Sequence, residues 1–319
     1  MAARINRCIE LLSQDIAVYY TGHHTGHVLT YEEGCKDAQT WADYINIGME
    51  HGAFDMGGLM NYMRGLVDGG PTRSGHRTPT VIVEAPVNGT DETNVRHNAW
   101  QFRQILGRGA HGIILCQAET PEAVRAFVEA CRYPIGAQGV DPAIPSPLER
   151  MAGKPRGMPR RDPDGRLYLG IGTRGQGSEP EAGHVWGLDP IQYKQRCDPW
   201  PLNPKGELML GVKLESPEGV ARCEEILAVP GLAYAEIGPG DLGFALGYLT
   251  TRNDPYPPEM QSARDRILRA CQRNGLAFLE ACWPANVDQR IADGVRILAG
   301  GREEAARIGR ARQGRKMPV

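Results

Sequence analysis

The sequence lacks several features that would assign it to a special class of protein. No stretch approaches the roughly 18 consecutive apolar residues that a membrane-spanning helix requires. The formal net charge is only −2, from 36 basic and 38 acidic side chains, so no excess charge attracts nucleic acid or a membrane surface. Charged residues also interrupt the N-terminal region, where a secretory signal would need an apolar core. We therefore expect a cytoplasmic protein with no nucleic-acid or membrane partner.

The cysteines lack the spacing of common metal and redox motifs. The chain has eight cysteines, and no two of them form a C-x-x-C pair, so neither a structural zinc site nor a thioredoxin-like pair is indicated. Several lie on apolar faces of predicted elements, as Cys116 and Cys131 do. We interpret them as free, buried thiols that pack as small hydrophobic side chains.

Short apolar runs alternate with amphipathic helical stretches along the 319 residues. Such runs are typical of parallel strands that helices cover on both faces. The predicted strands are 15–20, 44–49, 80–85, 112–116, 207–215, 233–237, 276–281 and 295–298. Eight strands alternating with helices predict an α/β fold, a (β/α)8 TIM barrel formed by residues 1–319 as one domain. A doubly wound sheet is the alternative, but no G-x-G-x-x-G follows the first predicted strand.

Residues 134–204 interrupt this alternation. They contain half of the chain's 24 prolines, together with a basic cluster over residues 150–161, and show little hydrophobic periodicity. We expect a long proline-rich loop inserted after the fourth strand. Long loops in compact domains are often functional or form interfaces, and a loop that follows a barrel strand begins on the active face.

Polar side chains follow most of the predicted strands. Catalytic residues of a barrel lie at the carboxyl ends of its strands, so these side chains are candidates for a site. The catalytic candidates are His51 and Glu84. The candidates for substrate binding are His23, His24, Gln117 and Trp283, with Arg174 from the insertion.

Two carboxylates follow neighbouring strands. Glu215 ends the fifth predicted strand, and Asp241 follows the sixth. Carboxylate oxygens on one rim repel each other unless a cation or protons neutralise them, and they are the ligands that Mg²⁺ and Mn²⁺ prefer. The pair therefore favours a divalent metal site. Each carboxylate could instead begin a helix, where it would suit the helix dipole.

Three histidines follow the first strand, at positions 23, 24 and 27. On a helix, His23 and His27 would share one face and could bind a second metal ion, but Gly22 and Gly26 favour a loop. Two interpretations stay open for this segment. It is either a solvated polar loop or a loop whose histidines contact substrate and transfer protons.

A set of short motifs adds a resemblance to a known family. The motifs are 211–219 (GVKLESPEG), 229–232 (VPGL), 237–243 (IGPGDLG), 49–52 (MEHG), 119–123 (ETPEA), 131–134 (CRYP) and 173–177 (TRGQG). In order and spacing they resemble the HpcH/HpaI aldolases, metal-dependent class II pyruvate aldolases of the phosphoenolpyruvate/pyruvate barrel superfamily. The resemblance spans most of residues 40 to 300 but not the stretch 134–170.

The resemblance implies a chemistry and an assembly. It implies Mg²⁺, Mn²⁺ or Co²⁺ held by Glu215 and Asp241, a small α-keto acid substrate, and retro-aldol cleavage that releases an aldehyde and is assisted by His51. It also implies a homo-oligomer, a trimer or hexamer. The candidate subunit contacts are His184, Trp186, Tyr193 and Trp200; alternatively, these four hold the insertion against its own barrel.

The chain departs from the family at three charged positions. The family's arginine at the end of strand three falls at Ala85, and two aspartates that support the histidine fall at Gly48 and Gly107. Glu84, beside the lost arginine, faces either the interior or the outer helices. An inward Glu84 would be protonated, bind a cation or pair with Arg174, and it would serve either as an acid–base group or as a structural ion-pair partner.

Three functions follow from these observations. The first is a metal-dependent carbon–carbon lyase whose substrate differs from the usual hydroxy-keto diacids. The second is an ordinary 4-hydroxy-2-oxo acid or pyruvate aldolase, in which Arg174 or another insertion arginine replaces the lost one. The third is a non-catalytic metal-binding barrel, which the joint presence of Glu215, Asp241 and His51 disfavours, because a binding protein need not keep a metal site beside a base.

Overall fold

Eight parallel strands close into a barrel in the computed structural model, which describes residues 4–250, 255–299 and 302–316. The strands are β1 (Val18–His23), β2 (Tyr44–Gly48), β3 (Thr80–Asn88), β4 (Gly112–Cys116), β6 (Leu208–Leu214), β7 (Tyr234–Ile237), β8 (Ala277–Ala281) and β9 (Ile297–Ala299). The strand order is β4-β3-β2-β1-β9-β8-β7-β6, and pairing of β4 with β6 closes the ring. The predicted (β/α)8 barrel is confirmed. The two-residue β5 (Pro199–Trp200), which the sequence did not predict, pairs with β6.

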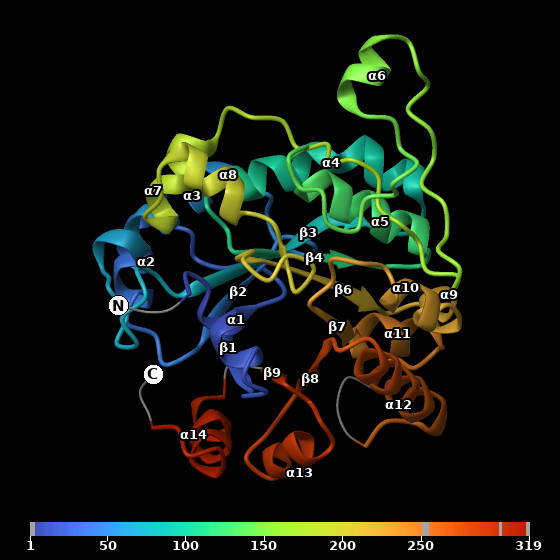
Figure 1. Ribbon diagram of the computed structural model, residues 1–319. Helices are drawn as coiled ribbons and strands as arrows, with labels where there is room; N and C mark the ends of the chain where they lie inside the picture. The colour runs from blue at the N-terminus through green and yellow to red at the C-terminus, as the bar shows by residue number, and fades with distance from the viewer. Residues whose placement is uncertain (1–3, 251–254, 300–301, 317–319) are drawn as a thin grey trace.

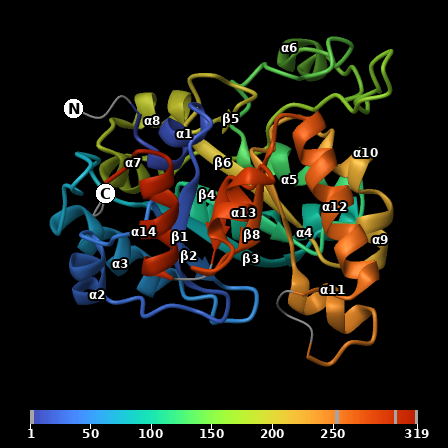
Figure 2. The same ribbon diagram turned by 90° about the horizontal axis from the view of Figure 1, so that it is seen from below.

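Helices surround the strands (Figures 1 and 2). They are α2 (Tyr31–Asp37), α3 (Met56–Asp68), α4 (Glu92–Gly107), α5 (Pro121–Cys131), α9 (Pro217–Ala221), α10 (Cys223–Leu227), α11 (Pro239–Ala245), α12 (Pro258–Arg273), α13 (Val287–Ala292) and α14 (Glu303–Arg312). Local chemistry sets their starts: the side chain of Thr120 accepts a hydrogen bond from the backbone of Ala123, and Pro121 occupies the first turn of α5. Within the described residues, no helix is long and apolar enough to cross a membrane. All eight cysteines are free thiols, and all except Cys35 are buried.

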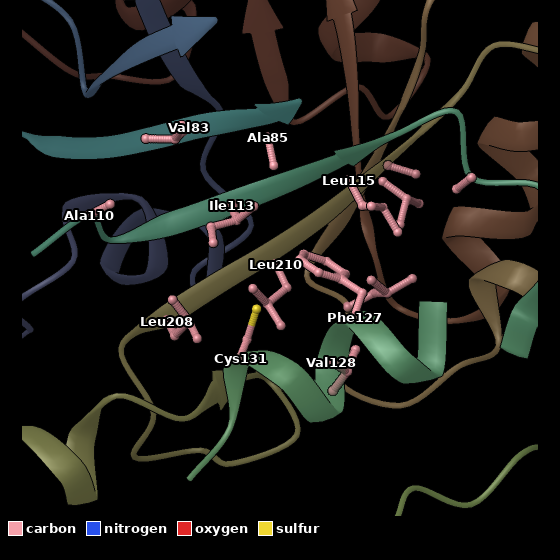
Figure 3. Close-up of a cluster of buried hydrophobic side chains, with 14 of the residues drawn as sticks. Val83, Ala85, Ala110, Ile113, Leu115, Phe127, Val128, Cys131, Leu208 and Leu210 are labelled. Carbon is pink, nitrogen blue, oxygen red and sulfur yellow. The ribbon is translucent and has the colours of Figure 1, made fainter. Parts of the chain in front are cut away.

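Alternating side chains divide each strand between the barrel interior and the outer helices. On β3, Val83 and Ala85 point outward and join the buried layer that includes Leu115 and Phe127, between the strands and α5 (Figure 3). Glu84, between them, points inward. A side chain at position 85 therefore cannot enter the barrel, so the inward position near the end of β3 is that of the glutamate.

The amino-terminal end of the barrel is closed. Helix α1 (Arg7–Leu12) packs Cys8, Ile9 and Leu11 against interior residues such as Tyr44 and Met209. Asn6 caps this helix and also donates to the backbone oxygen of Glu207 at 3.1 Å. The open end is therefore the carboxyl end of the strands, where the candidate side chains were predicted.

Residues 134–204 contain more regular structure than a loop. They form α6 (Pro147–Met151), α7 (Glu179–Trp186) and α8 (Pro190–Arg196). Trp186 and Tyr193 are buried in their own barrel: Trp186 donates from Nε1 to the Gly109 oxygen at 2.8 Å and stacks on His111 at 5.4 Å. The prediction that these two aromatic residues contact another subunit is therefore wrong. His184 is exposed and Trp200 is half-buried.

Helix α6 stands away from the body on an extended segment (Figure 1). Its Leu148 and Met151 are 74% and 85% exposed. A capping box on Ser146 and Glu149 stabilises this short helix. The insertion thus consists of a part that packs on the barrel and a projecting part with exposed apolar side chains.

Candidate active site

A buried lysine occupies the interior near the carboxyl end of the barrel. Lys213 on β6 is 3% exposed, and its Nζ lies 2.8 Å from Glu50 Oε2 and 3.4 Å from Glu84 Oε2. Burial lowers the pKa of Lys213, but surrounding groups, Cys116, Glu84, Glu236 and Glu215, raise it well above its ordinary value. Lys213 is therefore a permanent cation that compensates the buried carboxylates.

Glu215 follows β6 and is almost completely buried. Its Oε1 accepts a hydrogen bond from the backbone N–H of Gln117 at 2.8 Å, whereas its buried Oε2 has no hydrogen-bond partner among the described residues. Burial and the neighbouring Glu50 raise the pKa of Glu215 to about 8, against the opposing charge of Lys213. Such an oxygen needs a proton or a cation.

Two backbone features shape the surroundings of Glu215. Gln117 adopts a left-handed conformation with φ of 50°, which directs its N–H to the carboxylate. Gly238 leaves room for Glu215, because a Cβ at position 238 would lie 2.0 Å from Oε2. The backbone of Gln117 therefore contacts Glu215, a predicted metal ligand. The sequence led us to expect that Gln117 binds substrate and did not predict this contact.

His51 and Asp241 lie at the solvent side of this cluster. His51 Nε2 is 3.6 Å from Asp241 Oδ2 and 3.6 Å from Glu50 Oε2. Asp241 comes from the first turn of α11, and both side chains are partly exposed. Two groups of possible metal ligands have ligand atoms within 4.8 Å of one another. One group is Glu50, His51 and Asp241, and the other is Glu50, Cys116 and Glu215. Glu50 therefore connects the two predicted metal ligands.

His24 and Glu84 form a hydrogen-bonded pair beside Lys213. His24 Nδ1 is 2.6 Å from Glu84 Oε1, and Asn46 donates to the same oxygen at 2.9 Å. Burial raises the pKa of Glu84, but His24, Lys213 and Asn46 outweigh it and lower the pKa to about 2. Glu84 is therefore ionised at neutral pH, and the alternative of a protonated Glu84 is wrong.

Arg174 does not reach this site. Its guanidinium is buried between the Tyr133 ring, 4.5 Å away, and Tyr193, whose hydroxyl oxygen is 3.1 Å from Nη2. Tyr193 in turn donates to the Leu106 oxygen near the end of α4. Helices of a (β/α)8 barrel run back against the strands, so this position lies at the opposite end from the site. The predictions that Arg174 binds substrate or pairs with Glu84 are therefore wrong.

The remaining candidates are spread around the rim. His23 is exposed. His27 lies 2.9 Å from Asp37 and packs edge-on against Tyr62, so it does not share a metal site with His23. Trp283, half-buried after β8, lies under the Arg302 guanidinium at 4.3 Å.

The two glycines at the lost aspartate positions have different surroundings. A Cβ on Gly48 would lie 1.9 Å from the His24 backbone oxygen, so the loop after β1 fills the space that an aspartate would need. Gly107 ends α4 and packs on Ser178, with 3.0 Å between a Cβ placed there and the serine Cβ. It lies at the amino-terminal end of the barrel, away from His51.

The sequence assigned no role to several members of the cluster, although Tyr20 and Glu50 stand at the ends of predicted strands. They are Tyr20, Asn46, Glu50, Cys116, Lys213 and Glu236. One signal was available: residues two apart on a strand share a face, so Lys213 must point to the same side as Glu215. The buried lysine could therefore have been assigned to the interior once Glu215 was.

Comparisons with known proteins agree with this architecture. Residues 83–307 match the sequence model of the HpcH/HpaI aldolase/citrate lyase family. A hydroxypyruvate/pyruvate aldolase from Roseobacter denitrificans is 25% identical over 235 residues, 74% of this chain and 67% of that protein. A 2-keto-3-deoxy-L-rhamnonate aldolase from Klebsiella pneumoniae is 26% identical over 65% of this chain and 61% of its own length.

Solved structures share the fold. A family protein from Burkholderia cenocepacia aligns with a TM-score of 0.65 and 21% identity over 97% of both chains. An HpcH/HpaI aldolase from Desulfitobacterium hafniense aligns with a TM-score of 0.61 and 19% identity over 96% of this chain and 94% of that one. With the family match covering most of the sequence and the curated relatives being aldolases, the chain is an enzyme of the aldolase/lyase type and belongs to the HpcH/HpaI aldolase/citrate lyase family.

Proposed function

We propose that the protein is a divalent-metal-dependent class II carbon–carbon lyase that cleaves a small hydroxylated 2-oxo acid by a retro-aldol reaction. The observation that carries the proposal is Glu215: its buried Oε2 lacks a hydrogen-bond partner among the described residues, and its carboxylate adjoins Glu50. A divalent cation would satisfy this oxygen. The names of the curated relatives, aldolases of hydroxypyruvate, pyruvate and a 2-keto-3-deoxy sugar acid, support the reaction type.

Glu215 and Asp241 would hold the cation, with Glu50 next to both. Oxygen donors suit Mg²⁺ or Mn²⁺, and the nearby imidazole of His51 is compatible with Co²⁺. Burial raises the pKa of Cys116 well above its ordinary value, so its thiol stays protonated and is a poor ligand. When bound, the cation supplies a Lewis acid that stabilises negative charge on the keto oxygen.

The side chains around this position would carry the remaining work. His51, 3.6 Å from Asp241 and half exposed, is placed to take the proton of the substrate hydroxyl. Trp283 offers an apolar face at the rim for the distal part of the substrate. The backbone of Gln117 holds Glu215 in position.

Interior charge favours a substrate other than the usual hydroxy-keto diacids. Position 85 faces outward, Arg174 lies at the other end of the barrel, and Lys213 is paired with Glu50 and Glu84. A second carboxylate on the substrate would meet a cluster rich in carboxylates. The alternative, an ordinary 4-hydroxy-2-oxo acid or pyruvate aldolase, would need a cation from the rim, where Arg302 stands over Trp283.

Metal binding and turnover test the proposal. In Glu215→Gln and Asp241→Asn, calorimetry should show at least a tenfold loss of Mn²⁺ affinity while the fold is kept. Glu218→Gln, an exposed carboxylate three residues from Glu215, is the matched control and should bind as the wild type does. Unchanged affinity in both site variants contradicts the assignment. Pyruvate release from a panel of 4-hydroxy-2-oxo acids then tests the substrate, and fast turnover of diacids would exclude the altered specificity.

We further propose a homo-oligomer, a trimer or hexamer. The exposed Leu148 and Met151 on the projecting α6 support it, since apolar side chains on a projecting helix are suited to contact a second copy. Light scattering at micromolar concentration tests it. A monomeric mass would exclude the assembly.

A further inference from the structure

The loop after β1 is held against β2 by contacts that only glycine permits. Gly22 has φ of 103°, and a Cβ there would lie 2.0 Å from the Asn46 oxygen. A Cβ on Gly48 would lie 1.9 Å from the His24 oxygen, and one on Gly52 would lie 2.8 Å from the Gly26 Cα. The first approach lies within the pairing of β1 with β2, and the other two fix the backbone of the loop, so the loop is not a freely solvated polar segment.

This packing places the His24 imidazole over the inward carboxylate of β3. Nδ1 is 2.6 Å from Glu84 Oε1, a short contact of the kind that charge-assisted hydrogen bonds make, and Nε2 is 3.2 Å from the Tyr20 hydroxyl. Glu84 is buried, whereas the His24 side chain is 44% exposed. A buried carboxylate thus orients a histidine whose side chain is partly open to solvent and whose Nε2 contacts the hydroxyl of the buried Tyr20.

Charged groups from several strands face His24. Glu84 on β3 and Glu236 on β7 are negative when ionised, Lys213 on β6 is positive, and Tyr20 on β1 is neutral. Burial lowers the pKa of His24, but its bond to Glu84 and the two carboxylate charges raise the pKa to about 9, against the charge of Lys213. His24 therefore carries a proton at neutral pH.

Retro-aldol cleavage requires two proton transfers. The hydroxyl on C4 loses a proton as the C3–C4 bond breaks and its electron pair passes into the enolate of the 2-oxo acid. The enolate then takes up a proton at C3 to give the methyl or methylene product. The base that takes the hydroxyl proton can return it to C3, or a second, protonated group can supply the proton there.

We infer that His24 and Glu84 form a second proton-transfer centre of this enzyme, in which His24 Nε2 donates the proton that C3 of the enolate accepts. The inference rests on the proposed function. His51 accepts the hydroxyl proton beside Asp241, and His24 is the acid. Glu84 is a positioning residue that fixes the imidazole through Nδ1. After the transfer His24 is neutral and takes up a proton from solvent, while His51 releases the hydroxyl proton to solvent, so the protons balance.

Deuterium exchange isolates the second transfer. Pyruvate in D₂O with Mg²⁺ exchanges its methyl protons only through the enolate, without carbon–carbon cleavage, and NMR follows the loss of the methyl signal. His24→Gln keeps a donor toward Glu84 and should slow exchange by about 100-fold or more, the range of general acid–base catalysis, with unchanged Mg²⁺ affinity and melting temperature. His97→Gln, an exposed histidine on α4, is the control and should exchange at the wild-type rate.

Titration of His24 provides a readout independent of activity. In the wild type its imidazole resonances should titrate near pH 9, and the exchange rate should rise with pH and level off above that pH, because the neutral imidazole must first remove a methyl proton from pyruvate. In Glu84→Gln the His24 titration and the pH dependence of exchange should move together to lower pH, because the carboxylate that raises the pKa of His24 is lost. A His24 titration that Glu84→Gln leaves in place overturns the pairing.

The outcomes separate the two proposals. Wild-type enzyme that binds Mg²⁺ but neither cleaves hydroxy-oxo acids nor exchanges pyruvate protons overturns the proposed function and, with it, the role of His24. Wild-type exchange that persists at full rate in folded His24→Gln overturns the inference alone and leaves the metal-dependent lyase standing.

Discussion

Replacing Lys213 by methionine tests whether the buried cation compensates the carboxylates of the barrel. Methionine keeps the length of the side chain but removes the charge that lies 2.8 Å from Glu50 and 3.4 Å from Glu84. Removing one partner of a buried ion pair costs about 3–5 kcal/mol. The fall in the pKa of Glu84 from its ordinary 4.5 to about 2 corresponds to about 3 kcal/mol, which Lys213 shares with His24. We therefore expect the variant to lose about 3–5 kcal/mol in free energy of unfolding at neutral pH.

The loss should depend on pH in a fixed direction. The pKa of Glu84 is lower in the folded than in the unfolded state, so its contribution is fully present above about pH 4.5 and disappears as pH falls toward about 2. The difference between wild type and Lys213→Met should therefore be largest at neutral pH and smaller near pH 3.5.

Urea unfolding followed by far-UV circular dichroism, in the presence of a chelator, measures both values. The chelator is needed because a bound metal ion would stabilise the folded state by itself. Lys36→Met is a matched control: its Nζ lies 2.9 Å from Glu33, a similar distance, but the side chain is 74% exposed. The control should change stability by less than about 1 kcal/mol. A Lys213→Met variant that loses as little free energy of unfolding as the control does refutes the reasoning. A loss that is the same at neutral pH and near pH 3.5 also refutes it.

Three further predictions concern the loop, the metal site and the insertion. Gly48→Ala should lower both turnover and melting temperature, because its Cβ would lie 1.9 Å from the His24 oxygen; kinetics and thermal unfolding that match the wild type would contradict this. By calorimetry, Mn²⁺ affinity should rise with pH up to about 8, the pKa of Glu215, and level off above it, because protons compete with the metal; a flat profile would contradict the assignment. Trp186→Ala should lose about 3–5 kcal/mol in free energy of unfolding, since the ring packs inside its own barrel; a changed mass with unchanged stability would show instead that it contacts another subunit.

The strands were predictable because each is a short apolar run buried on both faces, a pattern that depends little on distant contacts. The helices and the short strand of the insertion were not predictable in this way. Its helices α7 and α8 have only eight and seven residues, so apolar periodicity is weak, and β5 has only two residues. A local signal was still present, since Asp189 and Gln192 form a capping box at the start of α8.

The site was predictable only as far as strand ends define it. Glu215, Asp241 and His51 were correctly expected on one rim, because parallel strands bring their carboxyl ends together. Which charged side chains pair there depends on how the strands are aligned around the barrel. Lys213 and Glu50, for example, are 163 positions apart in the sequence, so no local pattern shows that they pair. The position of Arg174 depends on the path of the insertion, which no short-range pattern defines.

The charges of the interior also explain how the barrel functions without the arginine that the family resemblance places at Ala85. The inward position near the end of β3 is Glu84, and the cation lies on β6 instead, at Lys213. This lysine contacts two carboxylates and lowers the pKa of Glu215, so its charge stabilises the protein rather than reaching outward to substrate. Under the proposed function, recognition of the substrate's acid group would fall to a cation at Glu215 and Asp241 and to His24, whose side chain is oriented by a buried carboxylate and partly open to solvent. The substrate specificity of this enzyme should accordingly follow the loop after β1 more closely than the end of β3.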